Sequence, residues 1–145
     1  MKLRHQFVDH IPDKLQEGVL YVSTRFGTVV HLCASGCGKE VVTPLGPSEW
    51  KITYDGRTVS LEPSIGNWGL SCRSHYWIEK GKIRWARGFS EGEVEEVRQE
   101  ARKRRDRYYR MGEAKLPRDL AESSTQSGTW TIIRRLLGSL KNAWK

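Results

Sequence analysis

Cysteine and long hydrophobic runs are both scarce in this chain of 145 residues. Three cysteines are too few for the framework of several disulfide bonds that holds many small secreted domains together. No stretch approaches the ~20 apolar residues of a membrane span, and residues 1–13 carry charges and a proline where a secretory signal has an apolar segment. We therefore expect a cytoplasmic protein that does not bind a membrane, with cysteines that bind a metal, act in catalysis or fill the core.

Acidic residues are fewer than basic ones, and the net charge is +8. The excess is spread, because residues 1–90 hold 12 Lys and Arg against 8 Asp and Glu, and residues 91–145 hold 13 against 9. Only residues 102–107, RKRRDR, form a dense basic run, and such a run is usually the solvated face of a helix. The charge pattern therefore does not favour nucleic acid as a partner.

Short β-prone runs separated by turn residues fill the chain from about residue 18 to residue 85. FGTVVHLCA and KEVVTPL meet at a GCG turn, WKITY and RTVSL flank Asp55–Gly56, and YWIEK and KIRWA flank Gly81. Each pair is typical of a β-hairpin, since glycine accepts the positive φ that tight turns need. We predict a small, hairpin-rich β domain over residues 1–88.

Helical signals begin at residue 90. Ser90 and Glu93 have the S-x-x-E form of a capping box, which predicts a helix over residues 89–111. Residues 112–129 contain Gly, Pro, Ser and Thr with little to bury, as a linker does. In residues 130–145 apolar side chains recur at helical spacing, which indicates an amphipathic tail helix that packs on its own domain or a second copy, or binds a membrane surface or a partner's groove. The predicted fold class is α+β overall, mainly β with a C-terminal α-helical extension.

Two close pairs of metal-binding side chains stand out. Cys33 and Cys37 bracket a glycine-containing turn, and Cys72 and His75 form C-x-x-H further along, while His31 is a fifth candidate. Zinc sites commonly draw ligands from such pairs. We predict that Cys33, Cys37, Cys72 and His75 hold Zn²⁺ in a closed structural site. Two other interpretations stay open: the cysteines fill the β-core beside hydrogen-bonded histidines, or two of them form a redox pair, although no C-x-x-C is present.

Ser64 is the candidate nucleophile. It follows Pro63, which favours extended geometry, and precedes Gly66 and Asn67, which favour a sharp turn, so its hydroxyl is expected at the exposed end of a strand. Amides of the 65–67 turn and the Asn67 side chain would donate to an oxyanion, and His31, the histidine that zinc leaves over, would act as the base. The alternative is that Ser64 and Asn67 are ordinary turn residues.

Three segments carry a family resemblance. HLCASGCGKEVVTPLGPSEWKITYDGRTVSL, EPSIGNW and CRSHYWIEKGKIRWA, which lie within about His31 to Ala86, together resemble a family of small bacterial proteins. Its members are often encoded beside ubiquitin-like proteins and beside enzymes that resemble ubiquitin-activating and ubiquitin-conjugating enzymes. The pattern is H-x-C-x₃-C, PSIGNW and C-x-S-H-Y-W-I. The chain departs from it at Ser35, where relatives often have the middle cysteine of C-x-C-G-C.

The resemblance implies a role in a ubiquitination-like pathway. It suggests a serine-type peptidase that processes a ubiquitin-like precursor or removes the ubiquitin-like protein from its targets. Ser64 matches the serine of PSIGNW, and the expected partners are the ubiquitin-like protein and its activating and conjugating enzymes. A hypothesis of another class is a non-catalytic zinc-binding adaptor that recruits a conjugation enzyme or nucleic acid, for which the Ser64 hydroxyl would be dispensable.

Overall fold

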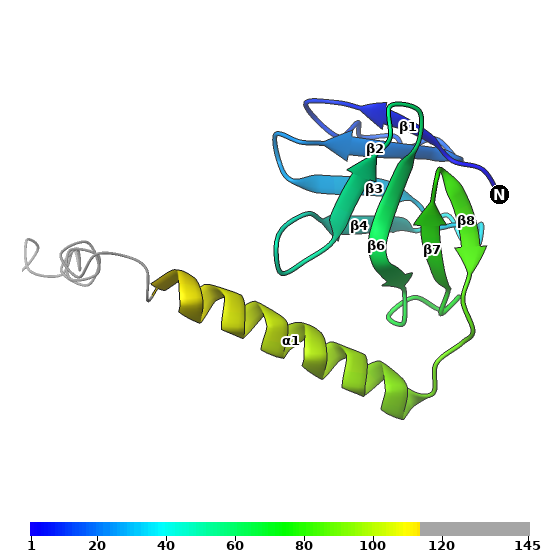
Figure 1. Ribbon diagram of the computed structural model, residues 1–145. Helices are drawn as coiled ribbons and strands as arrows, with labels where there is room; N and C mark the ends of the chain where they lie inside the picture. The colour runs from blue at the N-terminus through cyan, green and yellow to red at the C-terminus, as the bar shows by residue number, and fades with distance from the viewer. Residues whose placement is uncertain (114–145) are drawn as a thin grey trace, which may run out of the picture. The chain divides into compact units, whose positions relative to one another are not determined.

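Two four-stranded sheets and one helix make up the computed structural model, which describes residues 1–113 (Figure 1). The first sheet has the order β1 (Arg4–Phe7), β2 (Val19–Ser23), β3 (Thr28–Leu32) and β4 (Glu40–Pro44). The second has the order β5 (Lys51–Tyr54), β6 (Val59–Gly66), β7 (His75–Glu79) and β8 (Lys82–Trp85). Helix α1 spans Glu91–Glu113. The predicted fold class, mainly β with a C-terminal helix, is confirmed.

Three of the strand pairings are the hairpins that the sequence predicts, and β2 and β3 form a further antiparallel pair. β3 pairs with β4, β5 with β6 and β7 with β8, all antiparallel, as the turn residues predict. Asp55 closes the second hairpin, because one carboxylate oxygen accepts hydrogen bonds from the amides of Arg57 and Thr58. The sequence did not reveal β1, which pairs with β2 in parallel, or the antiparallel pairing of β6 with β7.

The core lies between the two sheets. On β4 buried and exposed side chains alternate, as expected for a strand with one face buried, whereas all five residues of β2 are buried. On β6, Val59 and Leu61 are buried while Glu62 is exposed. One hydrophobic cluster takes residues from both sheets, among them Val29 from β3 and Ile78 from β7. The sheets therefore hold one another in place, and the ends of β6 and β7 are fixed on a rigid support.

Helix α1 starts at the predicted capping box. The Ser90 hydroxyl accepts a hydrogen bond from the Glu93 amide, and the Glu93 carboxylate accepts one from the Ser90 amide at 2.9 Å. Val94 is buried, and Arg104 donates to the Ser48 carbonyl at 2.9 Å. Met1–Asp106 form one unit that contains both sheets and most of α1. In residues 1–113 no helix has the length and apolarity of a membrane span. The predicted tail helix and the linker from residue 114 onward lie outside the described residues.

Candidate active site

Ser64 and His75 meet where β6 and β7 end. The Ser64 Oγ lies 2.9 Å from His75 Nε2. Gly66 is paired with His75 across the two strands, and Ser64 stands two residues before Gly66, in the stretch between Leu61 and Ile65 where the strand register shifts. Diagonal neighbours of this kind are within reach of long side chains in an antiparallel pair.

A backbone carbonyl fixes the tautomer of His75. Its Nδ1 lies 2.9 Å from the carbonyl oxygen of Arg87. A carbonyl only accepts hydrogen bonds, so Nδ1 must carry the hydrogen, and in the neutral ring Nε2 is then an acceptor. The Ser64 hydroxyl therefore donates to Nε2. This is the arrangement of a nucleophile, a base and an orienting group, with a peptide carbonyl as the third member.

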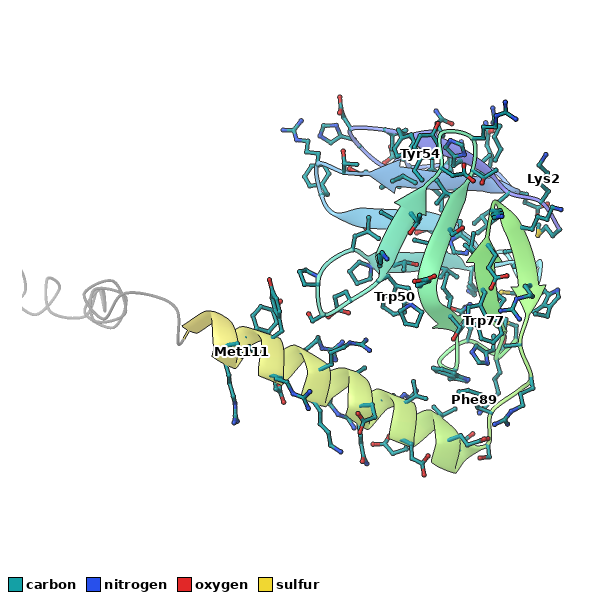
Figure 2. All side chains as sticks on the ribbon, viewed as in Figure 1. Lys2, Trp50, Tyr54, Trp77, Phe89 and Met111 are labelled. Atoms are coloured by element: carbon teal, nitrogen blue, oxygen red, sulfur yellow. The ribbon has the colours of Figure 1, made fainter. Side chains whose placement is uncertain are left out.

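Aromatic rings surround the imidazole of His75, which is only 5% exposed. The Phe89 ring is 4.5 Å away edge-on, and the rings of Trp68 and Trp77 are 5.5 Å and 5.6 Å away, measured between centroids. Phe89 also stacks on Trp68 at 5.5 Å. Figure 2 labels Trp77 on β7 and Phe89 just before α1. These rings leave the imidazole little freedom to rotate away from Ser64.

Gly66 is required by the position of Trp68. A Cβ at residue 66 would overlap the six-membered ring of Trp68. We expect Gly66→Ala to displace the indole and to destabilise the protein by about 1–3 kcal/mol, as overpacking does. Urea unfolding measures the loss. Gly69→Ala is the matched control, because no atom lies within 4 Å of a Cβ added at residue 69. Equal stability of the two variants would contradict this assignment.

Ser64 lines a cleft of about 800 Å³. Its apolar lining includes Trp50, Trp68 and Phe89 from the β domain and Val97 from α1, and all lining residues belong to the unit Met1–Asp106. Trp50 and Phe89 are labelled in Figure 2. The volume is within the usual range for ligand sites, about 300–1,000 Å³.

Three thiols form a second cluster beside the site. The sulfur atoms of Cys33, Cys37 and Cys72 all lie within 4.8 Å of one another. Cys72 Sγ is 3.6 Å from that of Cys37 and 3.8 Å from that of Cys33. Hydrogen bonds from the hydroxyls of Ser35 and then Ser74 lower the pKa of Cys72 to about 6. Since the thiolate is the form that binds metals, these residues fit a thiophilic metal ion.

The predicted fourth zinc ligand is elsewhere. His75 is not part of the thiol cluster in residues 1–113, because both of its ring nitrogens are engaged, one by Ser64 and one by the Arg87 carbonyl. The C-x-x-H spacing suggested a shared site. In the structure, β7 begins at His75, and the imidazole contacts Ser64 on β6.

His31 does not lie where the sequence interpretation puts it. It is fully buried on β3, and its Nε2 lies 2.9 Å from the Tyr76 hydroxyl on β7. Burial lowers the pKa of His31 to about 4, so the ring is neutral at neutral pH. None of the hydrogen bonds of residues 1–113 joins His31 to Ser64, whereas His75 Nε2 lies 2.9 Å from Ser64 Oγ. His31 links the two sheets across the core.

Asn67 also differs from the expectation. Its side-chain amide donates to the Ser74 hydroxyl at 2.9 Å and approaches Cys33 Sγ at 3.7 Å. Its backbone amide donates to the Ser74 carbonyl at 2.9 Å. Asn67 therefore closes the loop between β6 and β7 instead of facing Ser64. This loop joins the two site residues, and the thiol cluster holds it at Cys72.

The sequence analysis did not identify two groups that contact site residues, the Arg87 carbonyl and the Ser74 hydroxyl. Any residue supplies a backbone carbonyl, so no side-chain pattern could have indicated the first of them. Ser74 does have a weak signal, because it directly precedes His75 in the SHYWI run of the family resemblance.

Comparison with known proteins identifies the family of this chain. The family model described as bacterial ubiquitination-like system serine protease (BubE) matches residues 7–86, more than half of the 145 residues. The match includes Ser64, His75 and all three cysteines. It confirms the resemblance seen in the sequence. No curated protein and no solved structure matches the chain.

Proposed function

This chain belongs to the family of bacterial ubiquitination-like system serine proteases, and on that premise we propose that it cleaves after the C-terminal residue of a ubiquitin-like protein. The cleavage would trim a precursor or release the ubiquitin-like protein from a target. Its partners are then the ubiquitin-like protein and the activating and conjugating enzymes that use it. The observation that carries the proposal is the 2.9 Å contact between Ser64 Oγ and His75 Nε2.

In the proposed reaction, Ser64 Oγ attacks the carbonyl carbon of the last ubiquitin-like residue, and His75 Nε2 takes the hydroxyl proton. Collapse of the tetrahedral intermediate breaks the C–N bond, and His75 returns the proton to the leaving amine. The ubiquitin-like protein is left as an ester on Ser64. Water then attacks this ester, with His75 again acting as base, and the free carboxylate departs.

Two backbone groups support these steps. The Arg87 carbonyl accepts from Nδ1 and stabilises the imidazolium that forms when Ser64 loses its proton. Gly69 lines the same cleft as Ser64, and its backbone N–H takes part in no hydrogen bond among residues 1–113. We assign this N–H as a donor to the oxyanion, in place of Asn67.

We also propose that the thiol cluster holds Zn²⁺. Cys33, Cys37 and Cys72 would supply three of the four ligands that a structural zinc site needs. Its effect would be structural, because Cys72 lies in the loop that joins Ser64 to His75.

The proposal is tested with a bacterial ubiquitin-like protein that carries a C-terminal reporter. We expect the wild type to release the reporter and to react with a fluorophosphonate at Ser64. Ser64→Ala should lose both activities, because no other hydroxyl in residues 1–113 has a hydrogen bond to His75. The control is Ser60→Ala, which removes another β6 serine that hydrogen-bonds only the Lys80 amide. If Ser64→Ala cleaves at the wild-type rate, Ser64 is not the nucleophile of a peptidase. The non-catalytic adaptor is then the favoured hypothesis.

A further inference from the structure

The group that orients His75 stands outside both sheets. The backbone hydrogen bond next to this group joins the Ala86 amide to the His75 carbonyl at 2.9 Å. The next residue, Arg87, supplies the carbonyl that accepts from His75 Nδ1. Residues 87–90 connect β8 to α1 and belong to neither element. Something other than the strand ladder must therefore hold this carbonyl in place.

The side chain of Arg87 provides that hold. Its two terminal guanidinium nitrogens donate to both carboxylate oxygens of Glu93, with Nη1 3.3 Å from Oε2 and Nη2 in closer contact with Oε1. Nη1 also donates to the Gly88 carbonyl at 3.3 Å. The guanidinium carbon lies 5.0 Å from the centre of the Phe89 ring, which itself packs on His75. Arg87 is thus fixed at several points.

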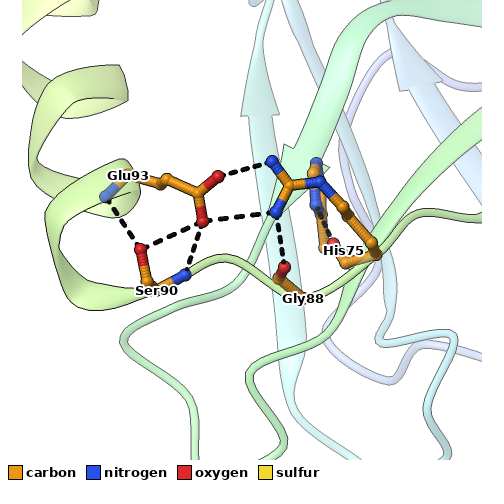
Figure 3. Close-up of polar contacts among 5 residues, drawn as sticks. His75, Gly88, Ser90 and Glu93 are labelled. Atoms are coloured by element: carbon orange, nitrogen blue, oxygen red, sulfur yellow. Dashed lines mark hydrogen bonds and ion pairs between the residues drawn. The ribbon is translucent and has the colours of Figure 1, made fainter.

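Glu93 connects the two ends of this segment. Its Oε2 accepts from Arg87 and also from the amide of Ser90 at 2.9 Å and the hydroxyl of Ser90 at 3.0 Å (Figure 3). The pair with Arg87 and the bonds from Ser90 lower the pKa of Glu93 to about 2, so it stays ionised at working pH. One carboxylate in the first turn of α1 therefore holds both residue 87 and residue 90.

We propose that Glu93 is a positioning residue for the active site, which acts through Arg87 to hold the Arg87 carbonyl against His75 Nδ1. A bidentate arginine–carboxylate pair has a fixed relative orientation, and this orientation limits rotation of the peptide that carries the carbonyl. Helix α1 thereby contributes to the geometry of the serine–histidine pair through Glu93, which makes no hydrogen bond to Ser64 or His75 in residues 1–113. The inference rests on the proposed function for its kinetic test only.

Glu93→Gln is the informative variant. Glutamine still fits a capping box, so the helix start is kept, but the charge that binds Arg87 is lost. Misplacement of a catalytic group by about 1 Å can cost 10²-fold, and we expect a smaller shift to lower kcat about tenfold with KM unchanged. Arg87→Gln should lower kcat equally, and the double variant should be no worse than either single one.

A second arginine–glutamate pair provides a matched control. Arg84 donates to both oxygens of Glu79, at 2.6 Å and 2.9 Å, and lies 4.3 Å from the centre of the Trp77 ring. It makes no hydrogen bond to the 87–90 segment. Glu79→Gln should therefore leave kcat at the wild-type value. An equal fall in kcat for Glu79→Gln and Glu93→Gln would overturn the proposal, because the effect would then be general.

A spectroscopic measurement decides the inference independently of any substrate. The His75 Nδ1 proton, held by the Arg87 carbonyl, should give a slowly exchanging downfield NMR signal in the wild type and in Glu79→Gln. In Glu93→Gln and Arg87→Gln this signal should broaden or disappear. If it stays unchanged in both, Glu93 does not position His75, even where Ser64-dependent cleavage is observed. If the wild type shows no cleavage but the signal responds, the proposed function fails and the positioning role stands.

Discussion

His75→Ala should lower kcat for release of a ubiquitin-like protein by about 10²- to 10⁴-fold, the usual contribution of a general base. His75 Nε2 accepts the hydrogen bond of the Ser64 hydroxyl, with 2.9 Å between the two atoms. In the variant, no side chain that hydrogen-bonds Ser64 in residues 1–113 is left to take its proton. KM should change little, since His75 is only 5% exposed and the substrate cleft is lined by other residues. Steady-state kinetics on a reporter fusion measure the effect.

His31→Ala is the matched control. It removes the other buried histidine, whose Nε2 contacts the Tyr76 hydroxyl. We expect kcat to stay within a few-fold of the wild type, while the free energy of unfolding falls by about 2–4 kcal/mol from lost volume and an impaired hydrogen bond. Assays below the melting transition keep the variant folded. If folded His31→Ala is inactive and His75→Ala is active, the roles of the two histidines must be exchanged.

Loss of one cysteine should have the largest effect on stability. Cys72→Ser removes a thiol that lies within 3.8 Å of both others, and the remaining pair is too few for a structural zinc site. Zinc at about a thousand times its Kd contributes about 4 kcal/mol, and each kcal/mol shifts the Tm of a small domain by about 4–8 °C. We therefore expect Tm to fall by roughly 15–30 °C. Cleavage should fall with it, because residues 67–74 connect the two site residues.

Metal analysis and calorimetry test this prediction together. Wild-type protein purified without added metal should contain one zinc per chain, and a chelator should lower its Tm to that of Cys72→Ser. Zinc added back should restore the wild type and have no effect on the variant. Ser35→Ala keeps all three thiols and should retain zinc. Metal-free wild type with an unchanged Tm would show that the cysteines only fill the core.

Local features of the sequence were enough to predict the hairpins and the start of the helix. Asp55–Gly56 and Gly81 occupy turns, and both glycines have positive φ. Ser90 and Glu93 make the expected capping box. These predictions succeed because their interactions join residues a few positions apart, so the residue types alone specify them. The gathering of Cys33, Cys37 and Cys72 was also predicted, since two short segments carry all three.

The position of Asn67 relative to Ser64 could also have been predicted in part from the sequence. Side chains alternate between the two faces of a strand, so Ser64 and Gly66 share one face and Ile65 and Asn67 the other. Ile65 is buried in the core, and Asn67 continues on that face toward Ser74. An alternation argument applied to PSIGN would have separated Asn67 from Ser64.

Only the tertiary structure decided which histidine serves Ser64. His31 and His75 are both near cysteines in the sequence, and ligand counting favoured His75 for the metal. The choice depends on the β6–β7 register, which pairs His75 with Gly66, and on the packing of the sheets, which buries His31 against Tyr76. The register and the sheet packing both depend on contacts between segments that are distant in the sequence. The free energy of these contacts comes from burial and strand pairing, which no local sequence pattern specifies. The sequence by itself thus determined the hairpins, the cysteine cluster and the nucleophile candidate, while long-range packing decided which histidine contacts Ser64 and which carbonyl orients that histidine.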